Sequence, residues 1–299
     1  MNWLLIAFAA PAVFALANIL DNYFSNKIFK SIPALVFYAS LSNLLFLPLF
    51  LVIEPPEWPT LSILPALLFL GLANLLYLFP YYQALRRDDT SIVISLFSLG
   101  KIFVPVLAFF IVDERLSLGQ YSGIAIIIFA STLLTLNGTN GAGKLRFNQS
   151  LGYMALSAFI VALETVFFKY VFEEVGWSTG YFWALIFSIL FAFFFFLIPA
   201  WKNQLVAEFS SFRRNFHWFV LEEFFTFAGQ GLMTFAISLV AVSLVEGIVA
   251  LQPLFVIVYA LILSKLLPQL FREKISTVAL FKKAILFLVM VLGVVLLLY

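Results

Sequence analysis

Three charged residues lie inside apolar stretches of this chain, where each needs a partner. Lys101 falls near the middle of the run 90–112, and Glu164 and Glu246 fall in two later runs. A charged side chain in hydrocarbon costs at least about 2.5–3.5 kcal/mol, so each should face a cavity or an opposite charge. Lys101 is roughly 15 Å from either end of its run, too deep to reach an interface. We expect a structural ion pair, a binding site for cargo, or both.

Glu246 precedes a further candidate, Gln252, and Pro253 follows it directly. Proline has no backbone N–H, so it leaves a carbonyl one turn earlier available to bind a cargo. Glu246 itself has two interpretations. It is either a site carboxylate or a carboxylate favoured by the positive end of its helix.

A polar face is predicted on the third apolar run. Asn74, Tyr77 and Tyr81 recur at spacings of three and four residues, which places them on one side of a helix. That side fits a cavity lining, and it fits hydrogen bonds to neighbouring helices almost as well. Asn18, toward the end of the first run, is a further candidate for the cavity.

Other polar groups are expected at the membrane surface. Asp21 lies close enough to the end of its run to be interfacial. Glu222 and Glu223 stand beside His217 near the start of a run and are expected to cap it. In "RRDD" at 86–89, the two arginines are expected to neutralise the two acidic residues.

The elements that must position these residues are membrane helices. The chain of 299 residues is 64% hydrophobic and only 11% charged, whereas soluble domains carry about 25% charged residues. About twenty apolar residues cross a bilayer as a helix. Breaks at charged, glycine and proline clusters predict an all-α polytopic membrane protein with ten transmembrane helices, over residues 3–26, 32–53, 61–85, 90–112, 118–137, 150–172, 178–201, 216–239, 243–267 and 277–299.

Composition also removes several classes of function. The chain has no cysteine, one histidine and a net charge of only +2. Thiolate chemistry is therefore excluded, and neither a metal site, a cofactor nor a nucleic-acid partner is expected. No phosphate-binding loop of the Walker type occurs, so ATP is not expected to drive this chain.

The chain is predicted to hold two inverted repeats of five helices, residues 1–137 and 150–299, joined by a polar, glycine-rich linker at 138–149. The stretches around Ala84 and Ala236 match at an offset of 152 positions. An odd number of helices per half turns the second half over, and the basic residues agree with this. Basic residues concentrate in alternate loops. By the positive-inside rule, this pattern is expected to place both termini outside. The basic residues of these loops are Lys27, Lys30, Arg86, Arg87, Lys144, Arg146, Lys202, Arg213, Arg214, Arg272 and Lys274.

These features resemble the drug/metabolite transporter (DMT) superfamily in its EamA-type branch. The resemblance rests on "ALRRDDTSIVISLFSLGKIFVPVLAFFIVDERLSLG" in the first half and "FAISLVAVSLVEGIVALQPLFVIVYALIL" in the second. Lys101 stands where the family often has a proline, and the second half lacks the "ER" motif. The resemblance implies alternating access through a central cavity lined by helices 1, 3, 4, 6, 8 and 9. Since Lys101 and Glu164 would both line it, Glu164 is the expected partner of Lys101.

The resulting prediction is a secondary transporter of a small metabolite, such as an amino acid or another zwitterion. An organic anion held at Lys101 and coupling to protons are left open, as are a monomer and a homodimer. The expected location is a prokaryotic inner membrane. Two alternatives are a non-transporting membrane scaffold and a membrane-embedded, lipid-linked transferase, although no spaced pair of carboxylates suggests the latter.

Overall fold

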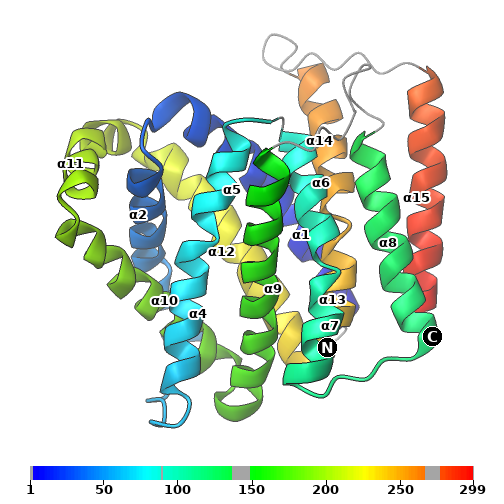
Figure 1. Ribbon diagram of the computed structural model, residues 1–299, viewed down its shortest axis with the longest axis horizontal. Coiled ribbons are helices and arrows are strands. Elements are labelled where there is room, and N and C mark those ends of the chain that lie inside the picture. The colour runs from blue at the N-terminus through cyan, green and yellow to red at the C-terminus, as the bar shows by residue number, and fades with distance from the viewer. Residues whose placement is uncertain (1–2, 89, 137–148, 267–276, 299) are drawn as a thin grey trace.

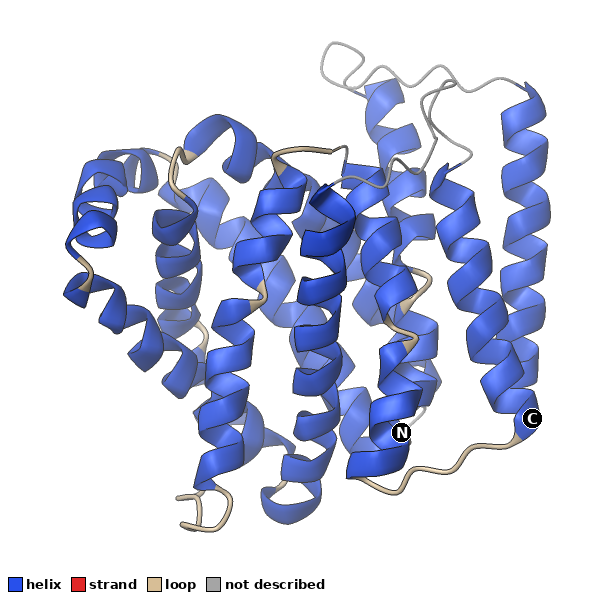
Figure 2. Cartoon of the chain, viewed as in Figure 1, coloured by secondary structure: helices blue, strands red, loops and turns tan. Residues whose placement is uncertain are grey.

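A computed structural model describes residues 3–88, 90–136, 149–266 and 277–298. These residues form helices joined by short connections, and no strand occurs among them (Figure 2). Each of the ten predicted ranges contains at least one helix. The predicted linker, except for Gln149, lies outside the described residues. The basic residues Lys144, Arg146, Arg272 and Lys274 also lie outside them.

The helices follow one another along the chain with short connections. The first half contains α1 (Trp3–Tyr23), α2 (Ile32–Ser42), α3 (Leu47–Ile53), α4 (Leu64–Leu76), α5 (Leu78–Leu85), α6 (Thr90–Gly100), α7 (Phe103–Ile111) and α8 (Leu118–Leu136). The second half contains α9 (Gln149–Val175), α10 (Trp177–Phe193), α11 (Pro199–Arg214), α12 (Phe216–Leu239), α13 (Val242–Val249), α14 (Gln252–Leu266) and α15 (Thr277–Leu298). Short π or 3₁₀ turns cover Phe24–Ile28, Asn43–Leu45 and Phe194–Leu197.

Within the described residues, seven helical stretches are long and apolar enough to cross a membrane: Trp3–Ile28, Ile32–Ile53, Leu64–Leu85, Ile92–Ile111, Ser150–Val175, Trp177–Leu197 and Val242–Tyr259. The chain is therefore a multi-pass integral membrane protein. The 24-residue α12 has the length but carries many polar residues, and a helix of that kind needs a protein or cavity environment on one side.

Prolines interrupt two helices near the centre of the molecule. Pro105 cannot donate to the Lys101 carbonyl, which instead accepts from the Val104 N–H at 3.1 Å, and the helix breaks between α6 and α7 at this point. Pro253 follows the break between α13 and α14 in the same way. Both breaks lie where the candidate charged residues are found.

Helices from the two halves pack against each other (Figure 1). α8 packs on α15, α1 on α12 and α4 on α10. The α8–α15 contact is close because Gly123 and Gly293 face each other; a Cβ on Gly123 would come within 2.6 Å of the Gly293 carbonyl oxygen. Small residues of this kind let membrane helices approach at backbone distance.

The "DER" motif after α7 also joins the halves. The Glu114 carboxylate accepts from the N–H groups of Val242 at 2.7 Å and Ser243 at 3.1 Å. These are the first residues of α13, so Glu114 satisfies N–H groups that a helix leaves free at its start.

The range 202–215, expected to be a loop, forms most of the amphipathic helix α11. α11 packs on α2, where the Glu208 carboxylate accepts from the Lys30 N–H at 2.9 Å. Arg86 corrects a second expectation. Its guanidinium donates to the carbonyls of Ser25, Phe29 and Lys30 at 2.9–3.0 Å, so it closes the α1–α2 connection instead of neutralising the neighbouring acidic residues.

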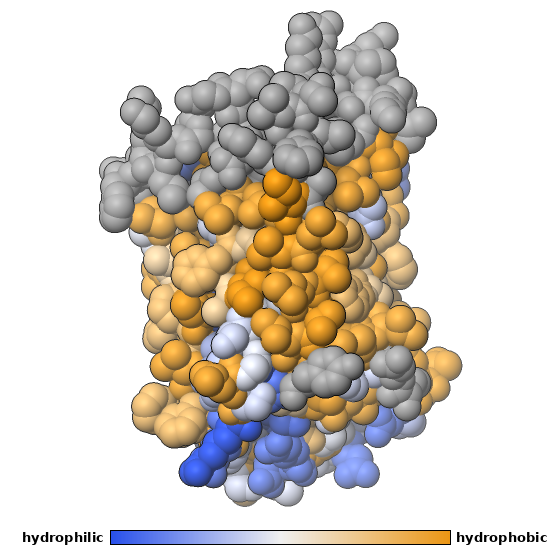
Figure 3. Space-filling view, turned by 90° about the vertical axis from the view of Figure 1, so that its right-hand side faces the viewer, coloured by the Kyte–Doolittle hydropathy of each residue, from blue (hydrophilic) through white to orange (hydrophobic). Residues whose placement is uncertain are grey.

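The outer surface is apolar where lipid is expected. Figure 3 shows hydrophobic residues over the face formed by α8 and α15, with hydrophilic residues gathered along its lower edge. Exposed Phe129, Leu288 and Leu292 belong to these helices. Such a patch is expected of a protein solvated by hydrocarbon.

Candidate functional site

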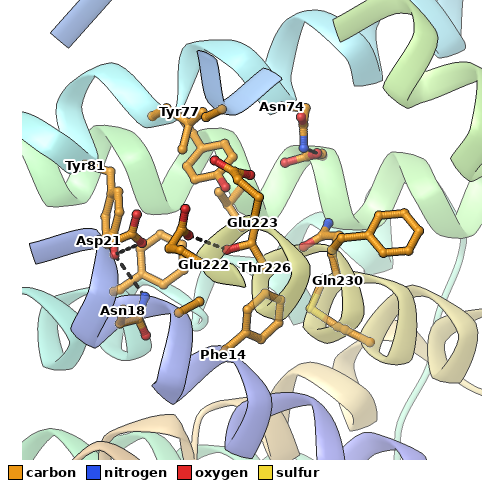
Figure 4. A pocket seen from close by; sticks show the side chains of 18 of the residues that line it. Phe14, Asn18, Asp21, Asn74, Tyr77, Tyr81, Glu222, Glu223, Thr226 and Gln230 are labelled. Atoms are coloured by element: carbon orange, nitrogen blue, oxygen red, sulfur yellow. Dashed lines mark hydrogen bonds between the residues drawn. The ribbon is translucent and has the colours of Figure 1, made fainter. Parts of the chain in front are cut away.

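A cavity lies at the centre of the helices, and both halves of the chain line it (Figure 4). Its polar lining comes from α1, α2, α4, α5, α9, α10, α12 and α14 and from short segments between helices. The polar and charged residues are Asn18, Asp21, Ser40, Asn43, Asn74, Tyr77, Tyr81, Tyr82, Lys101, Glu164, Tyr181, Glu222, Glu223, Thr226, Gln230 and Gln252. The predicted site residues all line this cavity except Glu246.

Asp21 is the centre of a hydrogen-bond network at one part of the cavity. Tyr81 and Tyr82 donate to its two carboxylate oxygens at 3.0 and 2.9 Å. Asn18 donates to the Tyr81 hydroxyl at 2.9 Å, and Gln252 donates to Asn18. The network therefore connects α14, α1 and α5. Asp21 is buried by the surrounding helices and lines the cavity.

Glu164 lies at another part of the cavity, on α9. Its carboxylate accepts from the Asn74 amide at 3.1 Å. The Asn74 amide oxygen in turn accepts from Ser188 at 3.2 Å, and the hydroxyls of Ser188 and Ser40 are 3.2 Å apart. Neutral groups alone thus hold this buried carboxyl group.

Lys101 pairs with Glu246, not with Glu164 as expected from the sequence. Both side chains are buried, at 6% and 2% exposure. The reason lies in the breaks of the helices: Lys101 follows the end of α6, and α13, which carries Glu246, packs against the adjoining α7. Glu246 lines a small pocket behind Lys101 with Ala158 and other residues. Since it contacts Lys101 in mid-helix, Glu246 is not simply a carboxylate at the start of a helix.

Glu222 and Glu223, expected to cap the start of their helix, also line the cavity. They are 2% and 4% exposed, and Thr226 donates to the Glu222 carboxylate at 2.9 Å (Figure 4). A signal for this was present in the sequence. Polar residues at 222, 226 and 230 recur every four residues along a membrane helix, which places them on one face.

The described residues include no group of three histidine, cysteine or acidic side chains arranged to hold a metal ion. The cavity can instead bind by hydrogen bonds, by its carboxyl groups and by aromatic rings. A helical membrane protein with a buried, polar, central cavity built from both halves of its chain has the architecture of a small-molecule carrier.

Comparison with known proteins finds a family match in the first half of the chain. Residues 1–136 match the model of the EamA-like transporter family, which belongs to the DMT superfamily. No curated protein matches the chain. A solved structure described only as a crystal structure of a protein aligns with a TM-score of 0.61 over 99% of this chain and 95% of that one. At 17% identity, this likeness concerns the fold alone.

Proposed function

We propose that the protein is a secondary transporter that moves a small metabolite across a prokaryotic inner membrane by alternating access. The family supports transport. The observation that carries the proposal is the central cavity, which is lined by four buried carboxyl groups that form no salt bridge among the described residues. Buried charged groups are costly and mark cargo and ion pathways in membrane proteins.

We further propose that the chain crosses the membrane ten times as two inverted repeats. Interrupted helices support this, because α6 begins at Thr90 and α13 begins at Val242, 152 positions later. The contacts support it as well. α1 packs on α12 and on the broken helix α13–α14, and its counterpart α9 packs on α4–α5 and on the broken helix α6–α7. Such repetition is typical of carriers that rock around a central site.

The proposed cargo is a small metabolite with at least one positive charge, which includes amino acids and other zwitterions. Lys101 was the expected partner of a carboxylate or organic anion, but it is engaged by Glu246. The acidic side of the cavity, with Asp21, Glu164, Glu222 and Glu223, has no such partner among the described residues. Protons are a second candidate for these carboxyl groups, as coupling ions.

Flux across liposomes tests the transporter assignment. The purified protein is first screened for thermal stabilisation by amino acids, amines and organic anions, and each stabilising compound is then tested for exchange across proteoliposomes. A transporter exchanges at least one compound that binds. A scaffold predicts binding without flux, and a lipid-linked transferase predicts turnover of a lipid donor without flux, so either result would contradict the proposal.

A further inference from the structure

The charge of the cavity lining is one-sided. Asp21, Glu164, Glu222 and Glu223 line it, each less than a tenth exposed. Lys101 is the one lysine, arginine or histidine among the lining residues that the structure describes, and Glu246 already neutralises it. Four carboxyl groups therefore line the cavity, and none of them forms a salt bridge among the described residues. A buried carboxylate is costly unless hydrogen-bond donors or cations compensate its charge.

These carboxyl groups form two separate groups along the cavity. Asp21 is bonded to Tyr81, and Glu164 is bonded to Asn74. Asn74 and Tyr81 are seven positions apart on the α4–α5 stretch, an offset of roughly 10 Å along its axis. Glu222 and Glu223 come from α12, which packs more extensively on α1, the helix of Asp21, than on α9, the helix of Glu164. Figure 4 shows Glu222 beside Asp21.

Aromatic and apolar side chains lie between and around the two groups. Tyr77 is one turn from both Asn74 and Tyr81, and Phe14, Phe97 and Phe227 also line the cavity. Aromatic faces attract ammonium groups and pack against methylene chains. The lining thus matches a molecule with positive ends and an apolar middle, and it offers no free cation for a carboxylate.

We propose that the cavity binds a small organic dication, a short aliphatic diamine, with one ammonium group beside Asp21, Glu222 and Glu223 and the other beside Glu164. The inference rests on the proposed transporter function and narrows its cargo. A zwitterion of the same length would place its carboxylate against one of the acidic groups. A monoamine would leave one acidic group without a cation. Both should therefore bind less well than the diamine.

Four compounds with the same carbon chain test this: 1,6-diaminohexane, hexylamine, 6-aminohexanoate and adipate. Proteoliposomes are loaded with unlabelled diamine, and the entry of labelled diamine is followed with each compound as competitor. Protein-free liposomes correct for permeation of the neutral amine. We expect counterflow of the diamine, with unlabelled diamine competing at least tenfold better than hexylamine and with 6-aminohexanoate and adipate weaker still.

Variants assign the two ends. Glu164→Gln should reduce the advantage of the diamine over hexylamine to less than about threefold, because one ammonium loses its carboxylate. The double variant Glu222→Gln/Glu223→Gln should abolish counterflow. Glu173→Gln is the matched control, since Glu173 is exposed and lies outside the cavity. Melting temperatures verify that each variant is folded, and if the cavity variants do not fold, the order of the four competitors on the wild type decides.

The outcomes separate this inference from the transporter assignment. Labelled forms of the other three compounds are tested for counterflow in the same way. Counterflow of 6-aminohexanoate or adipate without counterflow of the diamine, or equal competition by hexylamine and diamine, overturns the dication and leaves transport standing. If none of the four compounds exchanges, the dication is again overturned. The transporter assignment is then decided by whether any compound of the wider panel of amino acids, amines and organic anions exchanges across the proteoliposomes.

Discussion

Lys101 shows how a single residue is kept charged at the centre of a membrane protein. Its ammonium group contacts the Glu246 carboxylate, and the Phe97 ring lies 5.7 Å away from it. The second oxygen of Glu246 has no hydrogen-bond partner among the described residues. A buried pair of this kind contributes little net stability, but the loss of one member leaves the other charged and alone.

The first prediction follows from this asymmetry. Lys101→Met should destabilise the protein by about 3–5 kcal/mol, whereas Lys101→Met combined with Glu246→Leu should recover most of the loss, because no isolated charge remains. Thermal unfolding in detergent measures both. Lys101→Met combined with Glu164→Gln is the control. Recovery in that variant instead would mean that Glu164 is the true partner.

The network around Asp21 gives a second prediction. Tyr81→Phe removes the hydroxyl that accepts from Asn18 and donates to Asp21, so it should lower the transport rate about tenfold while costing only about 1–3 kcal/mol of stability. Tyr170→Phe is the matched control, because Tyr170 is exposed on α9 outside the cavity. Equal rates for both variants would show that the network has no part in transport.

At this scale, the sequence was more informative about which residues face inward than about their partners. Depth and spacing identified Lys101 and the Asn74 face. The partner of Lys101 could not be predicted, because it depends on the break after Gly100 and on which helix packs there. Distance from the end of an apolar run indicates depth in the membrane, but not whether a side chain is covered by other helices. It therefore does not predict that Asp21 and Glu222 are buried.

At the scale of elements, proline and glycine positions determine where helices break and where they touch. In the sequence, Pro253 indicates a break in its helix. The equivalent helix break at Lys101 is harder to predict, because Pro105 lies four residues later and affects a carbonyl group one turn before it. The helix α11 was read as a loop because its residues are polar enough to end an apolar run. Its packing on α2 depends on contacts with Ser31 and Lys30 that no local pattern reveals.

The glycine contact between α8 and α15 supplies the third prediction. Gly123→Ala should destabilise the protein by about 1–3 kcal/mol, because its Cβ would meet the Gly293 carbonyl oxygen at 2.6 Å and the Leu297 nitrogen at 2.7 Å. Gly152→Ala is the control. It lies in α9 with nothing within 4 Å of its added Cβ, so it should be neutral or stabilise by up to about 1 kcal/mol. Thermal unfolding of the two variants decides, and equal melting temperatures would contradict the close contact.

At the scale of the whole molecule, the connections gather at two opposite edges. The α1–α2 and α11–α12 connections lie at the upper edge of Figure 1, and the α3–α4 and α7–α8 connections lie at the lower edge, together with the first residues of α1 and the last of α15. The basic residues Lys27 and Arg214 belong to the upper edge. By the positive-inside rule we expect that edge to face the cytoplasm.

The fourth prediction tests this orientation, and the natural absence of cysteine makes it simple. Single substitutions Ser62→Cys and Ser117→Cys should react with a membrane-impermeant maleimide added to intact cells. Lys27→Cys and Arg214→Cys should react only after the membrane is opened. The reverse pattern would invert the orientation. Labelling of Ser62→Cys and Ser117→Cys from different sides would contradict the proposed ten-helix topology.

The contacts between the halves have a consequence for biosynthesis. α1 packs on α12, α4 on α10 and α8 on α15. The Glu114 carboxylate accepts a hydrogen bond from the start of α13, which is synthesised later. A ribosome that has delivered residues 3–136 has therefore inserted helices whose polar faces still lack their neighbours. Lys101 spends that interval without Glu246. We therefore expect the insertion machinery, or a chaperone within the bilayer, to keep this lysine out of contact with lipid until translation has proceeded more than a hundred residues further.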